Sequence, residues 1–407
     1  MIDKMENLKG WAYNTEKLPR DRQLLLLDNV QFIYELALAQ LELQSLGAQF
    51  EVTNEFREFR LLGAKDEDRL MRRAAYFKFV RGKATDYFKI IQKNRTRSVN
   101  QYLTHWIYPY KGKFHPQMIR ALLNIIGLKQ GNTVLDPFIG SGTTAVEAQL
   151  LGINCIGIDV SPLCVIQSKV KTESIYVLPQ IVELKPSLFN LETLDDSINS
   201  IPNDKVKNFH KMAKLVAISD NARRGRELSN AFLKNLELMI SSVSDYCQVV
   251  KELNIELGQI DIKTGDSRAL PLDNESIDGI VTSPPYSIAL DYVANDAHSF
   301  KDLGYDALKM RDNFIGVRGT GKTKMELYNA DMKKSYSEMY RLLKPNKYAV
   351  IVIGNATYQG KEVKTVEFTI DYMGGLGFRL VKNINKIIFG LYNVMKKENI
   401  LIFKKEG

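Results

Sequence analysis

The sequence predicts an α/β fold built on a mostly parallel sheet, and three observations carry this prediction. Short apolar runs typical of buried strands recur at residues 133–135, 154–158 and 276–281. A helical pattern separates the first two runs, as parallel strands require. Two further apolar runs, 378–381 and 399–403, are close enough in the chain to pair antiparallel. We therefore expect a parallel sheet closed by an antiparallel last strand.

The composition is that of an ordinary globular protein with an excess of positive charge. The 407 residues are 45% hydrophobic and 25% charged, enough for one large domain with insertions or for two to three domains. The formal net charge is +9. Residues 56–100 hold thirteen Lys and Arg against five Asp and Glu. Such a run favours a polyanionic partner, although a solvated helix face has the same composition.

Neither disulfides, nor a metal site, nor a membrane segment is indicated. Cys155, Cys164 and Cys247 show no paired spacing, so we expect no zinc site and no disulfide framework. The strongest apolar patch near the N-terminus, residues 24–27, is far too short to span a bilayer. We expect a cytoplasmic protein without membrane contact.

Residues 1–100 are predicted to form a helical, basic N-terminal region. Apolar residues recur at helical spacing over 24–43, and a second helical stretch is expected over 67–93. The second stretch interleaves aromatic and basic residues, which can stack bases and follow a nucleic-acid backbone. More often such aromatics form the buried face of a helix and the charges its wet face.

The first predicted strand runs into a glycine turn. Asp136-Pro-Phe138-Ile-Gly140-Ser141-Gly142-Thr143 follows the strand, a helix comes next, and the second strand ends at Asp159. The glycines let the backbone approach a ligand closely, and an acid at the second strand tip suits a ribose diol. Gly140, Gly142 and Ala145 also fit a dinucleotide-binding fingerprint, so a nicotinamide enzyme stays open at this point.

Two further segments need an interpretation. Residues 172–255 lack the α/β rhythm and read as a helical insertion, with Arg223, Arg224 and Arg226 clustered between two helical stretches. Residues 316–323 match the phosphate-binding pattern G-x-x-x-x-G-K-T, but no apolar strand precedes them. We expect a surface loop there rather than a nucleotide site.

The stretch 281–291 carries the clearest chemical signal. A buried strand is stopped by two prolines, which offer no backbone N–H and restrict the residue before them. The turn presents the Ser283 hydroxyl, the Pro284 carbonyl, Pro285 and the Tyr286 ring beyond the sheet edge. Two acceptors suit an exocyclic amino group, whose lone pair they turn out of the base plane, and the ring can stack on an extruded base. A Pro-Pro turn with Tyr covering the core would share this sequence.

The glycine turn and the sequence Thr282-Ser283-Pro284-Pro285-Tyr286 together resemble the S-adenosylmethionine-dependent DNA amino-methyltransferases of restriction–modification systems. The Ser-Pro-Pro-Tyr form is most similar to the N(4)-cytosine group. The resemblance covers about 105–171 and 259–403. It implies a Rossmann-like class I methyltransferase sheet, S-adenosylmethionine as cofactor, double-stranded DNA as substrate and a cognate restriction endonuclease as candidate partner.

The resemblance assigns roles residue by residue. Ser283, Pro284, Pro285 and Tyr286 match the catalytic motif, Asp159 the ribose-binding acid and Asp266 the position near the adenine. The cofactor loop and the segment upstream of it are matched by His115, Asp136, Phe138, Gly140, Ser141, Gly142 and Thr143.

The motif order also implies a domain organisation. The methyltransferase domain comprises 101–171 and 256–407, interrupted by the helical insertion 172–255, a candidate target-recognition element, and preceded by the region 1–100. The cofactor loop precedes the catalytic motif, whereas many relatives have the reverse order, so the place of target recognition stays open between the two unmatched regions.

The implied reaction is direct methyl transfer to a flipped cytosine. Carbon-5 methylation would need a Cys after a proline, and none of the three cysteines has one. An N(6)-adenine DNA enzyme and an RNA amino-methyltransferase remain alternatives. A nicotinamide oxidoreductase leaves the Ser-Pro-Pro-Tyr motif without a role, and a non-catalytic DNA-binding protein leaves both motifs without one.

Overall fold

The computed structural model describes residues 20–53, 57–94, 98–110, 112–184, 189, 192–285, 291–358, 361–387 and 397–407. None of the helices in these segments has both the length and the apolar character that crossing a bilayer requires.

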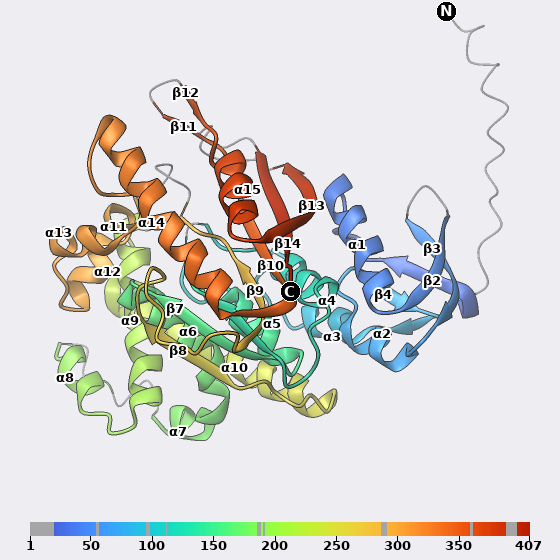
Figure 1. The fold of residues 1–407 in the computed structure, drawn as a ribbon. Coiled ribbons are helices and arrows are strands. Elements are labelled where there is room, and N and C mark those ends of the chain that lie inside the picture. Colours follow the sequence, from blue (N-terminus) through green and yellow to red (C-terminus); the bar gives the residue numbers. More distant parts are fainter. Residues whose placement is uncertain are drawn as a thin grey trace, which may run out of the picture.

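A seven-stranded sheet forms the centre of the molecule (Figure 1). Its order is β13-β14-β10-β9-β6-β7-β8. The bounds are β6 Thr133–Asp136, β7 Asn154–Asp159, β8 Ile260–Thr264, β9 Ile277–Thr282, β10 Leu343–Ile353, β13 Phe378–Ile387 and β14 Lys397–Lys405. β10, β9, β6, β7 and β8 pair in parallel, and β14 pairs antiparallel with both β10 and β13. The mostly parallel sheet with an antiparallel last strand is therefore confirmed.

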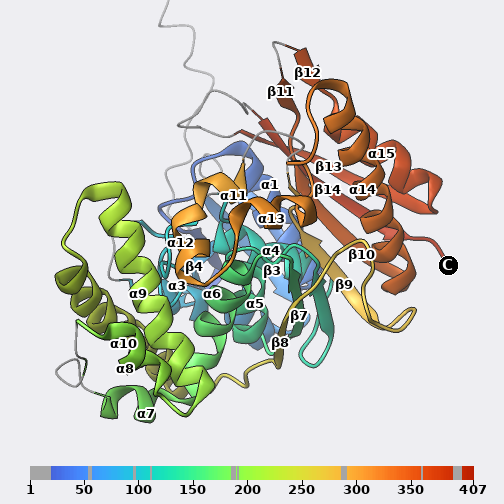
Figure 2. The same cartoon turned by 90° about the vertical axis from the view of Figure 1, so that its left-hand side faces the viewer.

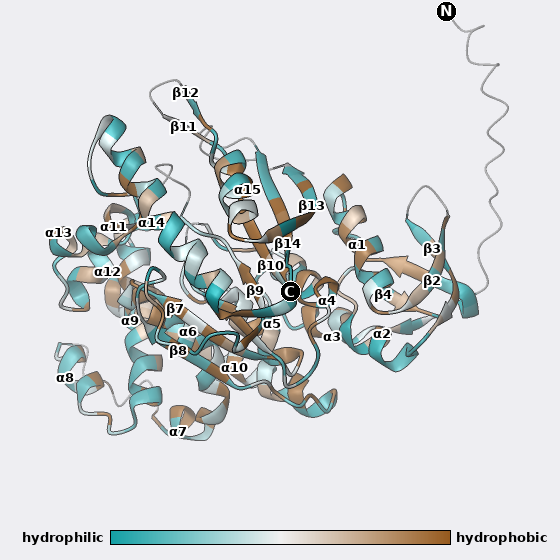
Figure 3. Ribbon diagram, in the orientation of Figure 1, coloured by the Kyte–Doolittle hydropathy of each residue, from teal (hydrophilic) through white to brown (hydrophobic). Residues whose placement is uncertain are grey.

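Both faces of this sheet are covered, which explains its continuous apolar strands. Within β10, Val350 and Val352 belong to the core beneath α4 and α5, whereas Ala349, Ile351 and Ile353 pack toward α14 and α15. These helices are α4 Pro116–Ile125, α5 Thr143–Leu150, α14 Gly321–Leu342 and α15 Thr365–Gly375. Figure 3 shows the central strands as the hydrophobic part of the ribbon, with α14 hydrophilic along much of its length.

The N-terminal region is not mostly helical, so that prediction was wrong for the part of it that is described. It holds a five-stranded sheet in the order β2-β3-β1-β4-β5. The bounds are β1 Gln23–Leu26, β2 Ala48–Thr53, β3 Glu58–Ala64, β4 Phe77–Val80 and β5 Lys83–Ala84. The 3-10 turn η2 Arg20–Arg22 and the helices α1 Ile33–Ser45, α2 Glu67–Arg73 and α3 Asp86–Ile91 complete it.

Local chemistry explains this error. The expected helix at 67–93 is broken at Arg81-Gly82, where both residues have positive φ (52° and 75°), as a tight hairpin between β4 and β5 needs. The apolar run at 24–27 supplies β1, because its leucines pair with the aromatic residues of β3 and β4. Tyr76, Phe77 and Tyr87 are buried, so these aromatic residues serve the core.

Buried polar contacts fix the N-terminal unit to the part of the chain that forms the central sheet. Glu42 of α1 accepts hydrogen bonds from the backbone of Ala75 and Tyr76 and from Asn124 of α4. Arg73 donates to Asn124 and to the carbonyl oxygens of Leu128 and Leu151. Each buried charge thus has partners, and removing one would leave the others unpaired. The N-terminal unit is therefore a packed part of the fold.

Every element described within 172–255 is helical, and the first of them is the end of α6 Pro162–Glu173. The others are η4 Ser174–Tyr176, α7 Leu178–Glu183, α8 Leu194–Asn199, α9 Asp204–Arg224 and α10 Leu228–Glu252. They share a second apolar core with residues of α6 and of α12 Ala297–Asp302. Figure 2 shows α9 beside α12.

The connection from β9 to β10 runs over the carboxyl edge of the sheet, where the parallel strands end. After residue 290 it forms α11 Tyr292–Asn295, α12, α13 Ala307–Met310, the turn η6 Arg311–Asn313 and the long helix α14. A small hairpin, β11 Ala356–Tyr358 and β12 Lys361–Val363, follows β10. This crossover, α6 and the glycine turn surround the site described next.

Candidate active site

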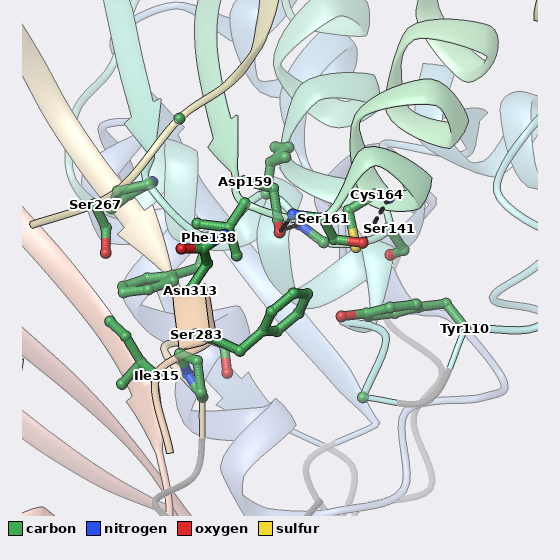
Figure 4. Close-up of a pocket in the computed structure, with 18 of the residues that line it drawn as sticks. Tyr110, Phe138, Ser141, Asp159, Ser161, Cys164, Ser267, Ser283, Asn313 and Ile315 are labelled. Atoms are coloured by element: carbon green, nitrogen blue, oxygen red, sulfur yellow. Dashed lines mark hydrogen bonds between the residues drawn. The ribbon is translucent and has the colours of Figure 1, made fainter. Parts of the chain in front are cut away.

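A pocket lies at the carboxyl edge of the central sheet, where the sequence placed the two motifs. Eight of the thirteen predicted site residues line it: Phe138, Gly140, Ser141, Thr143, Asp159, Asp266, Ser283 and Pro285. In the view of Figure 4, Ser283, Asn313 and Ile315 lie toward one side of the pocket and Ser161, Cys164 and Tyr110 toward the other, with Phe138 and Asp159 between them. The structure thus brings residues 145 positions apart in sequence, Phe138 and Ser283, into one cavity.

The glycine turn is held from behind by α6. Gly142 has φ 77° and caps α5, and a side chain there would come within 2.7 Å of the Ser168 hydroxyl, so only glycine fits. Gln167 and Ser168 both donate to the Gly140 carbonyl oxygen, at 3.0 and 3.1 Å. The buried Lys171 donates to the carbonyl oxygen of Ser141 at 2.7 Å. The turn is therefore rigid, with its carbonyl oxygens directed to α6.

Asp159 ends β7 and forms part of the pocket wall. Its two carboxylate oxygens accept hydrogen bonds from the backbone N–H groups of Gly140 and Ser161, each at 2.9 Å. Burial raises the pKa of Asp159 to about 6, against the effect of these donors. The geometry fits the ribose-binding role predicted for this acid.

Asp136 lies beneath the pocket rather than in its wall. Its carboxylate is buried and accepts from Thr144 at 2.7 Å, from Thr282 at 2.6 Å and from the Phe138 N–H at 3.2 Å. Burial raises its pKa to about 6, which the two threonine hydroxyls oppose. Thr282 directly precedes Ser283, so this hydrogen bond joins the glycine turn to the Pro-Pro turn.

Asp266 follows β8 and lines the pocket. Arg268 grips its carboxylate with Nε at 2.8 Å and Nη2 at 2.6 Å. Burial raises the pKa of Asp266, but the hydrogen bonds from Arg268 outweigh it and leave this pKa below its usual value. Asp266 is thus a fixed carboxylate at the end of the pocket where the resemblance expects the adenine.

The remaining predicted residues divide into three cases. Pro284 is buried and, like Gly142, does not line the pocket. His115 precedes α4, and its Nε2 lies 3.0 Å from Asn100 Nδ2; burial, aided by the charge of Lys386, lowers its pKa to about 4. It is not part of the pocket wall, which its neighbours Gly112 and Phe114 join instead. Tyr286 lies outside the described residues.

Several wall residues were not predicted. They are Tyr110, Gly112, Phe114, Pro137, Ile139, Val160, Ser161, Cys164, Gly265, Ser267, Asp296, Phe300, Asn313, Phe314 and Ile315. The wall residues that are adjacent in sequence to a predicted site residue could have been predicted from that position. Asp296, Phe300 and residues 313–315 come from the crossover, where no sequence signal marks them.

The residues present fit S-adenosylmethionine better than a metal. No group of three or more His, Cys, Asp or Glu side chains in the described part of the chain has a metal-binding arrangement. The pocket instead combines fixed carboxylates for hydroxyl and amino groups, a glycine turn and the aromatic rings of Tyr110, Phe114 and Phe138. Apolar walls with a few placed polar groups are typical of cofactor sites.

Comparison with known proteins shows a similarity over part of the chain. Residues 60–169 match the family model described as DNA methylase. This match begins within β3, earlier than the start near residue 105 that the motifs had indicated, and it ends before the Pro-Pro turn. It therefore includes part of the N-terminal unit together with the glycine turn and Asp159.

Three curated relatives are similar over parts of the chain. The type II methyltransferase M.BsoBI of Geobacillus stearothermophilus is 26% identical over 281 residues, 52% of this chain and 55% of that protein. The type II methyltransferase M.MjaII of Methanocaldococcus jannaschii is 36% identical over 121 residues, 30% of this chain and 21% of that protein. A tRNA (guanine(10)-N2)-dimethyltransferase of Methanocaldococcus jannaschii is 32% identical over 100 residues, 25% of this chain and 26% of that protein.

The alignment spans about half the length of the first of these relatives and about a fifth of the second. The family match and the two type II methyltransferases agree with the glycine turn, Asp159 and the Ser-Pro-Pro turn found at one sheet edge. Over these parts of its length the chain is similar to DNA methyltransferases, and the cofactor that this similarity implies is S-adenosylmethionine.

Proposed function

We propose that this chain methylates the N(4) amino group of cytosine in double-stranded DNA, as the modification enzyme of a restriction–modification system. The observation that carries the proposal is the pocket itself, in which Ser283 and Pro285 of the Pro-Pro turn share a cavity with the glycine turn and Asp159. The names of two relatives, both type II methyltransferases, support the restriction–modification assignment.

In the proposed mechanism the protein positions the reactants. Asp159 accepts the ribose hydroxyls, and Asp266 accepts from the adenine amino group. When bound, S-adenosylmethionine would supply an electrophilic methyl group for the amino nitrogen of the base, with the sulfur as leaving group and the extra proton on nitrogen lost to solvent. Ser283 Oγ, which lines the pocket, accepts one N–H of the amino group and helps to turn its lone pair toward the methyl carbon. The resemblance assigns the second N–H to the Pro284 carbonyl oxygen, and stacking on the flipped base to Tyr286.

The proposed DNA-binding surface includes the corner between α9 and α10. Residues 221–228 are all exposed, and Arg223 within them donates to the Pro109 carbonyl oxygen at 3.0 Å and lies 3.6 Å from Asp296 of the pocket wall. The side chains of Arg224 and Arg226 are 60% and 47% exposed. Each uses one N–H on Asp220 and keeps others for phosphate.

The aromatic and basic residues at 67–93 fit this role less well. Arg69, Arg72 and Arg73 line a different groove, together with Lys129, Gln130 and residues 253–256, which precede β6 and β8. That groove therefore lies at the amino edge of the sheet, on the opposite side from the pocket. We accordingly assign DNA contact to the insertion before the N-terminal basic run.

The proposal is tested by expressing the chain in a host free of DNA methylation and sequencing the DNA by single-molecule kinetics. We expect N(4)-methylcytosine at one short motif and, for Ser283→Ala, a loss of about 100-fold, since this removes a group acting on the reacting amino nitrogen. Methylated adenine would be consistent with the same mechanism but would show that the target base is adenine and not cytosine. Unmodified DNA from a host with soluble, cofactor-binding protein would overturn the proposal.

A tRNA substrate is the second candidate, because the M. jannaschii relative is named for the N2 amino group of a guanine. Methylation of transcribed tRNA by the purified chain, with host DNA unmodified, would favour this candidate.

A further inference from the structure

The long helix α14 presents a row of polar side chains that the proposed mechanism leaves unexplained. Tyr328, Asp331, Ser335 and Glu338 follow one another at helical spacing, so they share one face of the helix. Tyr328, Asp331 and Ser335 are buried. Each of the four contacts a different point of the carboxyl edge, at the ends of β8 and β9.

Tyr328 contacts the Pro-Pro turn. Its hydroxyl donates to the Pro285 carbonyl oxygen at 3.0 Å, and the residue is only 1% exposed. Pro284 and Pro285 have no backbone N–H, so this turn cannot be anchored by donors of its own as an ordinary turn can. A hydrogen bond to its carbonyl oxygen is therefore one of the few ways to fix the orientation of its peptide planes.

Asp331 and Ser335 contact the cofactor end of the pocket. Asp331 accepts from Arg268 Nη1 at 3.1 Å, and Arg268 in turn grips Asp266. Ser335 Oγ lies 2.9 Å from Ser267 Oγ, and Ser267 lines the pocket. One turn further on, Glu338 accepts from the Leu270 N–H at 2.7 Å. The segment after β8 is thus held along its length by one helix face.

This face also accounts for the sequence at 316–323 that matches a phosphate-binding loop. The loop precedes α14, and Arg318 within it forms an ion pair with Asp331. Because Asp331 binds Arg268 as well, a single buried carboxylate links the loop, the helix and the segment after β8. The loop folds back on its own helix, where a phosphate cradle would open toward a ligand after a buried strand.

We propose that α14 is a positioning element that aligns the two halves of the site, with Tyr328 orienting the Pro-Pro turn and Asp331 orienting Asp266 through Arg268. The inference rests on the proposed amino-methyltransferase function. It assigns Tyr328 to the transfer step and Asp331 to cofactor binding, so the two residues should have separable effects although they lie one helical turn apart.

The test compares Tyr328→Phe with Tyr336→Phe. Tyr336 is a matched control, because it is buried on the same helix and its hydroxyl is also hydrogen-bonded, to Thr369 at 2.9 Å, away from the site. We expect Tyr328→Phe to slow single-turnover methylation of DNA about 10-fold, the upper range for one hydrogen bond, with S-adenosylmethionine Kd unchanged within about twofold. Tyr336→Phe should keep the wild-type rate, and the Tm of both variants reports any general loss of stability.

Asp331→Asn should show the opposite split. Its weaker hold on Arg268 should raise the Kd for S-adenosylmethionine about fivefold, measured by calorimetry, while the single-turnover rate at saturating cofactor stays within about twofold. Equal rates for the two tyrosine variants, or an unchanged Kd for Asp331→Asn, would overturn the corresponding half of the inference. A wild-type chain that binds the cofactor but methylates no DNA would instead reject the proposed function, and the Kd comparison would still decide the role of Asp331.

Discussion

The two edges of the central sheet both carry charged hollows, but their charges are used differently. At the carboxyl edge, Asp159 is held by backbone N–H groups and Asp266 by one arginine, and both line a pocket whose wall includes five aromatic residues. At the amino edge, the groove is lined by Arg69 and Arg72 together with acids of the same unit, such as Asp66 and Asp68. The carboxylates of the first hollow are fixed by hydrogen bonds at the pocket wall, whereas the second hollow brings acidic and basic side chains together.

The difference teaches that the position of a charge relative to strand ends predicts function better than its density along the chain. The basic run at 56–100 is the strongest compositional signal, yet its structure is that of a packed unit. Within this run, Arg73 is buried and donates to the backbone carbonyl oxygens of Leu128 and Leu151. The acids at 159 and 266 are single residues, but each follows a parallel strand at the edge where ligands bind.

The sharpest test of this comparison replaces one carboxylate at each edge. Asp159→Asn should weaken S-adenosylmethionine binding about 10- to 100-fold, because a charge-assisted hydrogen bond to the ribose is removed. Asp68→Asn, in the amino-edge groove, should leave the affinity unchanged. Isothermal titration calorimetry measures both. Equal affinities for the two variants would contradict the assignment of the pocket.

The pH dependence of cofactor binding is the next largest expected effect. Burial raises the pKa of Asp159 to about 6, so its carboxylate is present above that pH and is progressively lost below it. We expect the S-adenosylmethionine Kd to be constant from pH 8 to 7 and to rise about 10-fold for each pH unit below 6. The Asp159→Asn variant has no such carboxylate and should lose this part of the dependence. A flat profile for the wild-type chain down to pH 5 would show that this acid does not bind the cofactor as a carboxylate.

The sequence predicted the carboxyl edge of the sheet well because strand tips and turns are local features. The glycine turn, β7 ending at Asp159 and the strand before the Pro-Pro turn all lie within one or two residues of their expected places. Phe138, Gly140 and Asp159 line the pocket as expected. The helices α9 and α10 of the insertion were likewise visible from their periodicity.

What sequence could not predict depends on contacts between distant segments. Asp136 was expected at the cofactor but is enclosed by Thr144 and Thr282, the second of which is far away in the chain. The pocket wall at Asp296 and 313–315 comes from a polar crossover whose path depends on packing against α6 and α9. The N-terminal sheet was missed because the leucine run at 24–27 and the aromatic and basic run at 67–93 both fit helical spacing. Only their pairing with distant strands shows that they contribute strands to a sheet.

The smallest expected effect concerns the two arginine clusters, and it decides which edge faces DNA. Replacing Arg224 and Arg226 together with Gln should reduce DNA affinity about fivefold at moderate salt. The slope of log affinity against log salt should fall by about 1 to 2 units, roughly 0.9 for each phosphate that the variant no longer neutralises.

The matched variant replaces Arg69 and Arg72 with Gln, which removes the same charge from the amino-edge groove. Because this variant has an equal net charge, any general electrostatic effect on DNA binding is common to both, and the difference in slope reports direct binding of phosphate. If the slope of log affinity against log salt changed more for the Arg69 and Arg72 variant, the DNA would have to bind at the amino edge. The base would then have to reach the pocket from the opposite side of the sheet, which the intact, buried strands of the central sheet do not allow, so the pocket assignment would fall with it.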